Sequence, residues 1–410
     1  MKKQFADFSS VRMDENNPKW DIAISRNNEI YQKDSDIRTP FERDIHRILH
    51  SNGYRRLKNK TQVFFAPQND HICTRIEHVT HVSSVAETIS KFLNLNLDLV
   101  RAISMGHDIG HAPFGHQGEY ILSEIAKEHS LSDFWHEGNS LHFIDNIETL
   151  PDSNGIHKNL DLTYAVRDGI VCHCGEVDEK FLLPRIEAKD LNLIKAGGKE
   201  ASFSYEGCVV KISDKIAYIG RDIEDALSYG ILTDKQIQEL EDIICQTYPD
   251  MKITEINTTV LMHRFIVDLC ENSTVEKGLC FSDDCFKAML RIKAFNYQNI
   301  YKHTRLNPFK NYARLVIRTI FEKLDECYVG NLKRNLKKEK NYFPQLIKTF
   351  ESWLIKYSDY DLEKKELKNL QNKVVYSIKN QAEYKKSIID FISGMSDNFA
   401  ITMFNEIISF

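Results

Sequence analysis

Several features that would place this 410-residue chain in a special class are scarce or missing. It has only nine prolines and seventeen glycines, and strand-like alternation of apolar and polar residues is rare, which argues against a β-rich fold. No apolar run approaches the roughly 20 residues that a membrane span needs. The opening residues MKKQFADFSS are not followed by the apolar segment of a secretory signal. We therefore expect a cytoplasmic protein with no membrane partner.

Charge and cysteine content exclude further classes. The formal net charge is −5, so no overall attraction draws the chain to nucleic acid, which is not expected as the main partner. The nine cysteines are scattered and odd in number, and a chain of this size needs no disulfide framework. Reduced cysteines in a cytosol fit this pattern best.

Helical periodicity, by contrast, runs along nearly the whole chain. Apolar residues recur at helical spacing in residues 78–95, 97–110 and 209–230, and past residue 235 nearly every stretch has the pattern of an amphipathic helix. The sequence predicts an all-α protein. We expect a core in residues 1–320, with its polar site in 71–230, and a C-terminal helical region in 321–410 that packs on this core.

The histidines are concentrated in one part of the chain. Eleven of the fifteen lie between His71 and His173, whereas surface histidines would be scattered. The stretch MGHDIGHAPFGHQGE, residues 105–119, holds three of them together with an aspartate, a glutamate, Pro113 and four glycines. The polar chemistry of the protein is therefore expected in this part of the chain.

Four of these residues have the types and spacing of metal ligands. His78 lies on the apolar line of its helix and faces inward, although a single inward histidine is more often a hydrogen-bonded core residue. His107 and Asp108 form a compact N/O pair suited to Mn, Fe, Zn or Mg. Asp214 follows about a hundred residues later on another helix. The order His, His-Asp, Asp is the ligand set of the HD-domain metal-dependent phosphohydrolases.

Six blocks, in the same order, extend this likeness over roughly residues 35–305. They are DIRTPFERDIHRILHSNGYRRLKNKTQVF, TRIEHVTHV, GHDIGHAPFGHQGE, FWHEGNSLHFI, GIVCHCGE and SDKIAYIGRDIEDAL. On these blocks the sequence resembles the deoxynucleoside triphosphate triphosphohydrolases, the dGTPase-like branch of the HD superfamily. The resemblance implies an HD-domain helical bundle with additional C-terminal helices.

The resemblance also implies roles for the matched positions. The implied metal ligands are His78, His107, Asp108 and Asp214, and the ion is a divalent metal, Mn²⁺ or Mg²⁺ before Fe, Zn, Ni or Co. The implied catalytic residues are His111, His116, Glu119 and His136. The implied substrate contacts are Gln62, Tyr218, Asp222 and Tyr301 at the sugar, and Arg75 and Lys215 at the phosphates. His116 is the main candidate for work at the α-phosphate and Glu119 orients it, while a supporting role stays open for His111 and Glu119.

The turn after His107 and the remaining histidines have simpler interpretations. Gly110 and Pro113 are expected to let the chain turn back over the metal, and Gly115 to let the backbone approach a ligand closely. The Cys-His-Cys run around His173 lacks the partner pair of a zinc site, so we interpret it as a helix end. Structural or exposed positions are assigned to His71, His81, His129 and His142.

The expected reaction is metal-dependent hydrolysis of a deoxynucleoside triphosphate, dGTP first, to the deoxynucleoside and inorganic triphosphate. The spacing of residues by itself supports only metal-dependent hydrolysis of a phosphoester. Two alternatives stay open: an HD phosphohydrolase acting on another nucleotide phosphoester, and a nucleotide sensor or single-strand nucleic-acid-binding protein without turnover. The resemblance further implies a homo-oligomer and leaves open an activating nucleotide at a second site.

Overall fold

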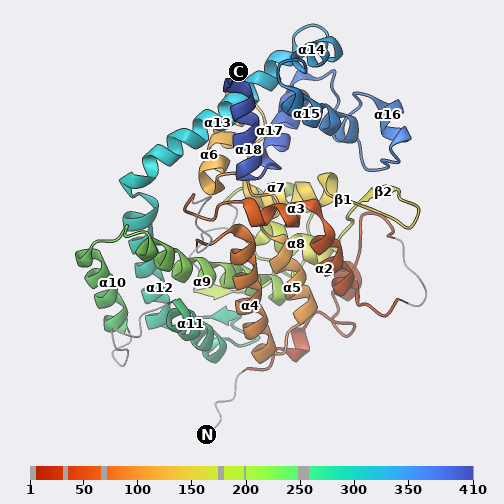
Figure 1. The fold of residues 1–410 in the computed structure, drawn as a ribbon. Coiled ribbons are helices and arrows are strands. Elements are labelled where there is room, and N and C mark those ends of the chain that lie inside the picture. Colours follow the sequence, from red (N-terminus) through yellow and green to blue (C-terminus); the bar gives the residue numbers. More distant parts are fainter. Residues whose placement is uncertain are drawn as a thin grey trace.

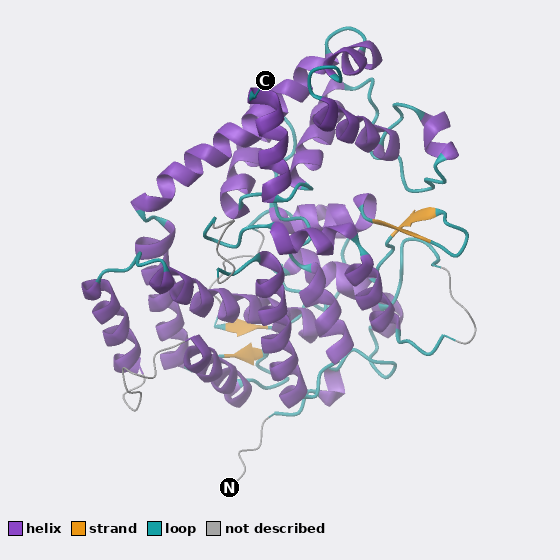
Figure 2. Ribbon diagram, in the orientation of Figure 1, coloured by secondary structure: helices purple, strands orange, loops and turns teal. Residues whose placement is uncertain are grey.

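The computed structural model describes residues 6–30, 36–65, 72–173, 180–197, 200–247 and 258–409. These residues form a helical molecule in which the strands make only two short antiparallel pairs, β1 with β2 and β3 with β4 (Figures 1 and 2). The predicted all-α class is confirmed. No helix among the described residues is both long and apolar enough to span a membrane.

The first half of the chain holds the following elements. The helices are α1 (Trp20–Ala23), α2 (Pro40–His50), α3 (Asn52–Arg56), α4 (Arg75–Leu93), α5 (Leu97–Gly106), α6 (Gly115–Glu128), α7 (His136–His142), α8 (Tyr164–Cys172) and α9 (Tyr205–Ser228). Short 3₁₀ turns lie at η1 (Ser9–Val11), η2 (Leu57–Asn59) and η4 (Leu191–Leu193), and a π-helical turn at η3 (Phe143–Ile147). The strands are β1 (Thr149–Pro151), β2 (His157–Asn159) and β3 (Phe181–Leu182).

The second half is built in the same way. Its helices are α10 (Asp234–Thr247), α11 (Thr258–Asn272), α12 (Asp283–Asn296), α13 (Asn307–Asp325), α14 (Leu332–Glu339), α15 (Pro344–Tyr357), α16 (Leu362–Leu367), α17 (Gln381–Ser393) and α18 (Asp397–Ile408). Strand β4 spans Leu279–Cys280, with a π-helical turn at η6 (Tyr297–Tyr301) and 3₁₀ turns at η7 (Thr304–Leu306) and η8 (Glu326–Tyr328).

Helices α4, α5 and α9 pack against one another and form the centre of the first half. Helix α4 begins at Arg75 because Thr74 and Glu77 make a capping box, and it ends where Asn94 takes a left-handed conformation with φ of 61°. Its Val82 and Ile89 are fully buried. The metal ligands expected from the sequence lie on these three helices or directly after one of them.

A second hydrophobic cluster joins α6 to the C-terminal helices α13, α15, α17 and α18. In Figure 1 these C-terminal helices form the upper part of the molecule, and α6 lies between them and the α4–α5–α9 core. Helix α13 passes residue 320 without a break, so no change of element marks the expected end of the core.

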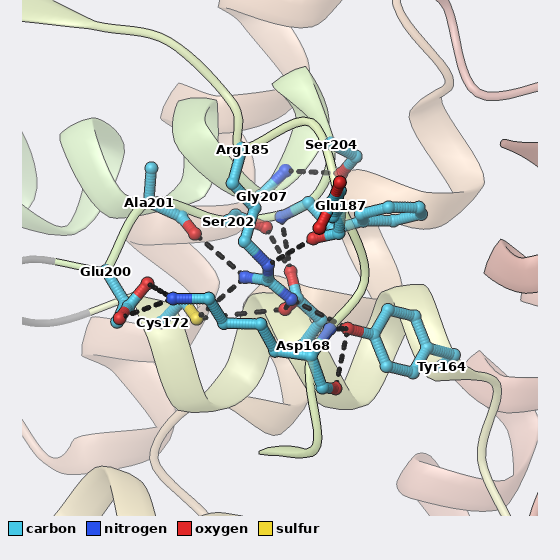
Figure 3. A network of polar contacts seen from close by, with 12 residues as sticks. Tyr164, Asp168, Cys172, Arg185, Glu187, Glu200, Ala201, Ser202, Ser204 and Gly207 are labelled. Atoms are coloured by element: carbon cyan, nitrogen blue, oxygen red, sulfur yellow. Dashed lines mark hydrogen bonds and ion pairs between the residues drawn. The ribbon is translucent and has the colours of Figure 1, made fainter. Parts of the chain in front are cut away.

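A buried polar network fastens the segment before α9 to α8 (Figure 3). Asp168 on α8 is fully buried, pairs with Arg185, and accepts hydrogen bonds from Ser202 Oγ (2.7 Å) and Phe203 N (2.6 Å). Arg185 also donates to the Tyr164 hydroxyl over 2.7 Å. Because α9 begins at residue 205, directly after this network, its start is held against the core. The eight cysteines within the described residues are all free thiols.

Candidate metal centre and active site

The four predicted metal ligands come together from three helices. His78 lies in the first turns of α4, His107 and Asp108 follow the end of α5, and Asp214 lies in α9. His78 Nε2 is 2.9 Å from Asp214 Oδ1, and His107 Nε2 is 3.7 Å from Asp108 Oδ2. His78, His107 and Asp214 each offer a ligand atom within 4.8 Å of the others. A side-chain group with metal-ligating chemistry therefore exists where the spacing predicted one.

The state of His107 tests whether this group fits a divalent cation. Its Nδ1 lies 2.6 Å from the carbonyl oxygen of Ser104, so this nitrogen carries the proton and donates it. Its Nε2 is buried without a hydrogen-bond partner. Burial lowers the pKa of His107 to about 4, so the ring is neutral at physiological pH. A neutral imidazole with one orphaned, buried nitrogen is what a metal ion binds, and the residues fit the implied cofactor.

Arg75, predicted to bind phosphate, is held against the metal ligands. Its guanidinium is 2.5 Å from Asp108 Oδ2 and donates to the carbonyl oxygens of Thr61 (3.2 Å) and Gln62 (3.3 Å). The residue is only 2% exposed. Three of the five N–H groups of the side chain are used in this way. Arg75 therefore balances the charge of Asp108 and links it to the segment that carries Gln62.

The four predicted catalytic residues form a second group, here named the histidine–glutamate cluster (His111, His116, Glu119 and His136). Glu119 lies between two imidazoles: its Oε2 is 3.2 Å from His116 Nδ1, and its Oε1 is 3.0 Å from His136 Nδ1. The His111 ring centroid lies 4.7 Å from that of His136 and 5.0 Å from that of His116. Only His116 is exposed, with 68% of its side chain accessible.

Burial and neighbouring charges give these groups different protonation states. Burial lowers the pKa of His136, but Glu137 and Glu119 outweigh burial and raise it to about 10. Burial raises the pKa of Glu119, yet its histidine partners hold it well below the usual range. Burial and the charge of Arg75 hold the pKa of His111 well below its usual range. The cluster thus combines a cationic His136, an ionised Glu119 and a neutral His111 at neutral pH.

The turn between His107 and His116 depends on positions that a side chain could not occupy. A Cβ on Gly110 would lie 2.2 Å from Ser140 N, so only glycine allows this close approach of α7. Phe114 and Gly115 both have left-handed backbones, with φ of 64° and 62°. A Cβ on Gly115 would meet the carbonyl oxygen of Gln62 at 3.0 Å. Gly115 thus permits the turn and the approach of a neighbouring protein segment, which differs from the expected approach of a ligand.

Most of the predicted sugar contacts lie around α9 and η6. Asp222 is buried in α9 and accepts a hydrogen bond of 2.5 Å from the Tyr301 hydroxyl in η6. Burial raises the pKa of Asp222 to about 6. Lys215 and Tyr218 lie half-buried on the same helix. Gln62 is buried, and its Oε1 has no hydrogen-bond partner, which leaves an acceptor for a ligand.

One histidine near the site was not predicted to belong to it. His173 follows the end of α8, as expected, but its ring centroid is 4.9 Å from that of His107 and 5.7 Å from that of His136. It therefore lies between the metal ligands and the histidine–glutamate cluster. The block GIVCHCGE, which contains His173, was a signal that could have pointed to the site. The spacing of a zinc site, with which we compared this block, does not bear on a single histidine that packs beside the HD ligands.

Two of the histidines expected to be structural or exposed have partners outside the site. His142 Nε2 is 2.9 Å from Asp390 Oδ2, and the His129 ring stacks on Phe321 at 5.2 Å. His81 is half-buried on α4. His71 lies outside the described residues.

Comparison with known proteins places this geometry in a family. The HD domain model matches residues 75–219, and the phosphohydrolase-associated domain model matches residues 279–343. A deoxyguanosinetriphosphate triphosphohydrolase-like protein of Caldanaerobacter subterraneus subsp. tengcongensis is 33% identical over 91% of this chain and 86% of its own. Proteins of the same name from Clostridium tetani and Desulfatibacillum aliphaticivorans are 31% and 30% identical, over 92% and 90% of this chain and 88% of each relative.

The chain belongs to the deoxyguanosinetriphosphate triphosphohydrolase-like family of HD-domain phosphohydrolases. The resemblance identified from the sequence blocks is thereby confirmed. In this HD-domain protein, the matched residues 75–219 include all four predicted metal ligands and the whole histidine–glutamate cluster. Tyr301 lies in the phosphohydrolase-associated match, and its hydrogen bond to Asp222 links that segment to α9, just past the end of the HD match.

Proposed function

We propose that this phosphohydrolase hydrolyses deoxynucleoside triphosphates, dGTP first among them, to the deoxynucleoside and inorganic triphosphate. One observation carries the proposal: several buried polar atoms have no hydrogen-bond partner. They belong both to residues expected to contact the sugar and to residues expected on the phosphate side. They are Gln62 Oε1 and Asp222 Oδ1 among the sugar contacts, and His107 Nε2 and both ring nitrogens of His111 among the phosphate-side residues. Because unpaired buried polar atoms cost free energy, a ligand that pairs with them is favoured.

The metal would be held by His78, His107, Asp108 and Asp214. A divalent ion bound there supplies charge neutralisation for phosphate oxygens and activation of water for attack on phosphorus, and Mn²⁺ or Mg²⁺ suits the mixed N/O donors. The neutral His107 and the two carboxylates need no proton loss at neutral pH to bind it, which supports this assignment.

The histidine–glutamate cluster would serve the phosphates and the leaving group. The cationic His136 would balance phosphate charge. His116 is the exposed member, and its Nδ1 is engaged by the ionised Glu119, so its other nitrogen is left to give a proton to the departing 5′-oxygen. Glu119 would act as the positioning partner that holds the His116 ring through its Nδ1.

The residues expected at the sugar would recognise the deoxyribose. Asp222 and Tyr301 are linked by their hydrogen bond and would pack beside the sugar, while Gln62 Oε1 would accept from its 3′-hydroxyl. A ribose would bring a 2′-hydroxyl against Tyr301, so ribonucleotides are expected to be poor substrates.

A product analysis tests this function directly. The purified full-length protein is incubated with each of the four dNTPs, singly and mixed, and with GTP, in Mn²⁺ or Mg²⁺, and the products are resolved by ion-exchange chromatography. We expect triphosphate and deoxynucleoside from dNTPs and neither from GTP. Release of orthophosphate or pyrophosphate, or no product from any dNTP, would contradict the proposal and favour another phosphoester substrate or the sensor alternative.

A further inference from the structure

A second set of metal-ligating side chains lies beside the HD ligands. His111, His116, Glu119 and His136 each offer one ligand atom, and these four atoms lie within 4.8 Å of one another. They come from the loop after α5, from α6 and from the first residue of α7. We propose that this histidine–glutamate cluster is a second metal site, selective for Zn²⁺ and similar transition-metal ions, and that filling it inhibits the enzyme.

The spacing inside the cluster suits a tetrahedral ion. Bonds of about 2.0–2.1 Å from zinc to nitrogen or oxygen place neighbouring ligand atoms about 3.3 Å apart. Glu119 Oε2, a single ligand atom, is 3.1 Å from His136 Nδ1 and 3.2 Å from His116 Nδ1. Two edges of such a tetrahedron therefore already have the right length. Protons on the two imidazoles hold these contacts in the structure, and an ion would take their place.

His111 provides the independent observation that a ligand belongs here. The residue is fully buried, and neither of its ring nitrogens has a hydrogen-bond partner. Its ring lies within 5.0 Å, centroid to centroid, of the rings of His116 and His136. A bond from one nitrogen to a metal ion would satisfy a group that the protein leaves unpaired. The exposed His116 would give the ion a way in from solvent.

The donor types decide which ions bind. Three imidazoles and one carboxylate favour Zn²⁺, Co²⁺ or Ni²⁺, whereas Mg²⁺ prefers oxygen ligands in an octahedral arrangement. The HD ligands, with two imidazoles and two carboxylates, accept a wider range. Zinc would thus fill both sites, and magnesium at most the HD centre.

Inhibition is expected because the ion would bind residues that the proposed reaction uses. Zinc bound to His116 and Glu119 takes the proton donor and its partner away from the leaving group. This part rests on the proposed function, whereas binding of the ion to the cluster does not.

Metal stoichiometry is the test. Metal-free full-length protein is dialysed against Zn²⁺ and then against buffer, and bound zinc is measured by mass spectrometry. We expect two ions per chain in the wild type, one in Glu119→Gln, one in His107→Ala and none in the double variant, with circular dichroism to confirm folding. The site is overturned if Glu119→Gln still binds two ions, or if the wild type binds one that His107→Ala removes.

Two further measurements use the wild-type protein, so they do not depend on whether the variants fold. Anomalous scattering at the zinc edge, from wild-type crystals soaked in Zn²⁺, should show a peak between Glu119 and the three histidines, and its absence overturns the site.

Zinc should also suppress dNTP hydrolysis measured in Mg²⁺, reversibly with chelator. Two bound zinc ions with undiminished hydrolysis would overturn the inhibition. Two bound zinc ions in a protein that hydrolyses no dNTP in Mg²⁺ or Mn²⁺ would support the site while refuting the proposed function.

Discussion

The HD core and the C-terminal helices contribute to the site in opposite ways. The core, residues 75–228, supplies nearly all the groups expected to touch metal and phosphate. The C-terminal helices α13–α18, residues 307–408, supply none of them, yet Asp397 of α18 accepts hydrogen bonds from Thr61 N (2.9 Å), from the Thr61 hydroxyl, and from Phe114 N (2.8 Å).

Lys60 makes a second bridge of the same kind. Its ammonium group donates to the carbonyl oxygen of His111 and, over 3.0 Å, to that of Ser393 in α17. The C-terminal helices thus hold the two segments that lead to Gln62 and His116. The comparison teaches that the proposed reacting groups and the contacts that position them are encoded in different parts of the chain.

The largest effect is expected from the core. His107→Ala removes the orphaned nitrogen that fits the metal, so we expect loss of the HD-site ion and a fall of dNTP hydrolysis to background. Metal content and product formation are measured on the same sample, with circular dichroism as the control for folding. Hydrolysis that survives without the ion would show that the reaction does not depend on this centre.

A smaller but selective effect is expected from Asp397, compared with Asp390 as a matched control. Both are buried aspartates of the C-terminal helices, but Asp390 pairs with His142 and Tyr376, away from the site. Asp397→Ala and Asp390→Ala should each cost about 1–3 kcal/mol of unfolding free energy, because buried donors lose their acceptor. Only Asp397→Ala should also lower kcat/KM for a dNTP, by about 10²-fold, because it displaces the turn that leads into α6 and His116.

Denaturant unfolding and steady-state kinetics on the two variants separate these expectations. Asp397→Asn keeps one acceptor oxygen, so it should recover part of the lost kcat/KM. Equal losses of kcat/KM in Asp397→Ala and Asp390→Ala would mean that the C-terminal helices act only through overall stability.

The sequence indicates the candidate site residues of the HD core well and the contacts made by the C-terminal helices poorly. The candidate metal ligands could be proposed from the sequence because metal chemistry demands particular residue types, and the spacing from His78 to Asp214 is recognisable without the fold. Asp397 could not be found, because a single aspartate that accepts backbone N–H bonds at a distant loop leaves no pattern in its own neighbourhood. His173 differs, because the block GIVCHCGE did mark its segment, but its position beside His107 depends on how α8 packs against α5.

An effect of intermediate size is expected from Lys60, whose contribution to the free energy of unfolding should depend on pH. Burial lowers the pKa of Lys60 to about 7, whereas an unfolded lysine titrates near 10.4. Between these pH values the unfolded chain binds a proton that the folded protein does not, so the lysine contributes more stability as pH rises, by at most about 1.4 kcal/mol per pH unit. Below about pH 7 both states hold the proton and its contribution is constant.

Comparison of the wild type with Lys60→Met isolates this group, because other titrations largely cancel. The unfolding free energy of the wild type, relative to the variant, should increase by about 2 kcal/mol between pH 7 and pH 9. A difference that stays flat across this range would show that Lys60 remains an ammonium ion in the folded protein, held by the carbonyl groups of His111 and Ser393.

The smallest effect is expected where the two regions meet at the surface. Arg318 of α13 pairs with Glu128 of α6 over 2.6 Å, and both side chains are partly exposed. Solvent and salt screen such a pair, so Arg318→Ala should cost less than about 1 kcal/mol and leave hydrolysis unchanged. The measurement still sharpens the comparison, because α6 carries His116 and Glu119. If removing this surface pair lowered kcat/KM as much as Asp397→Ala does, α13 would position the catalytic helix as well, and control of the site would extend beyond the buried bridges.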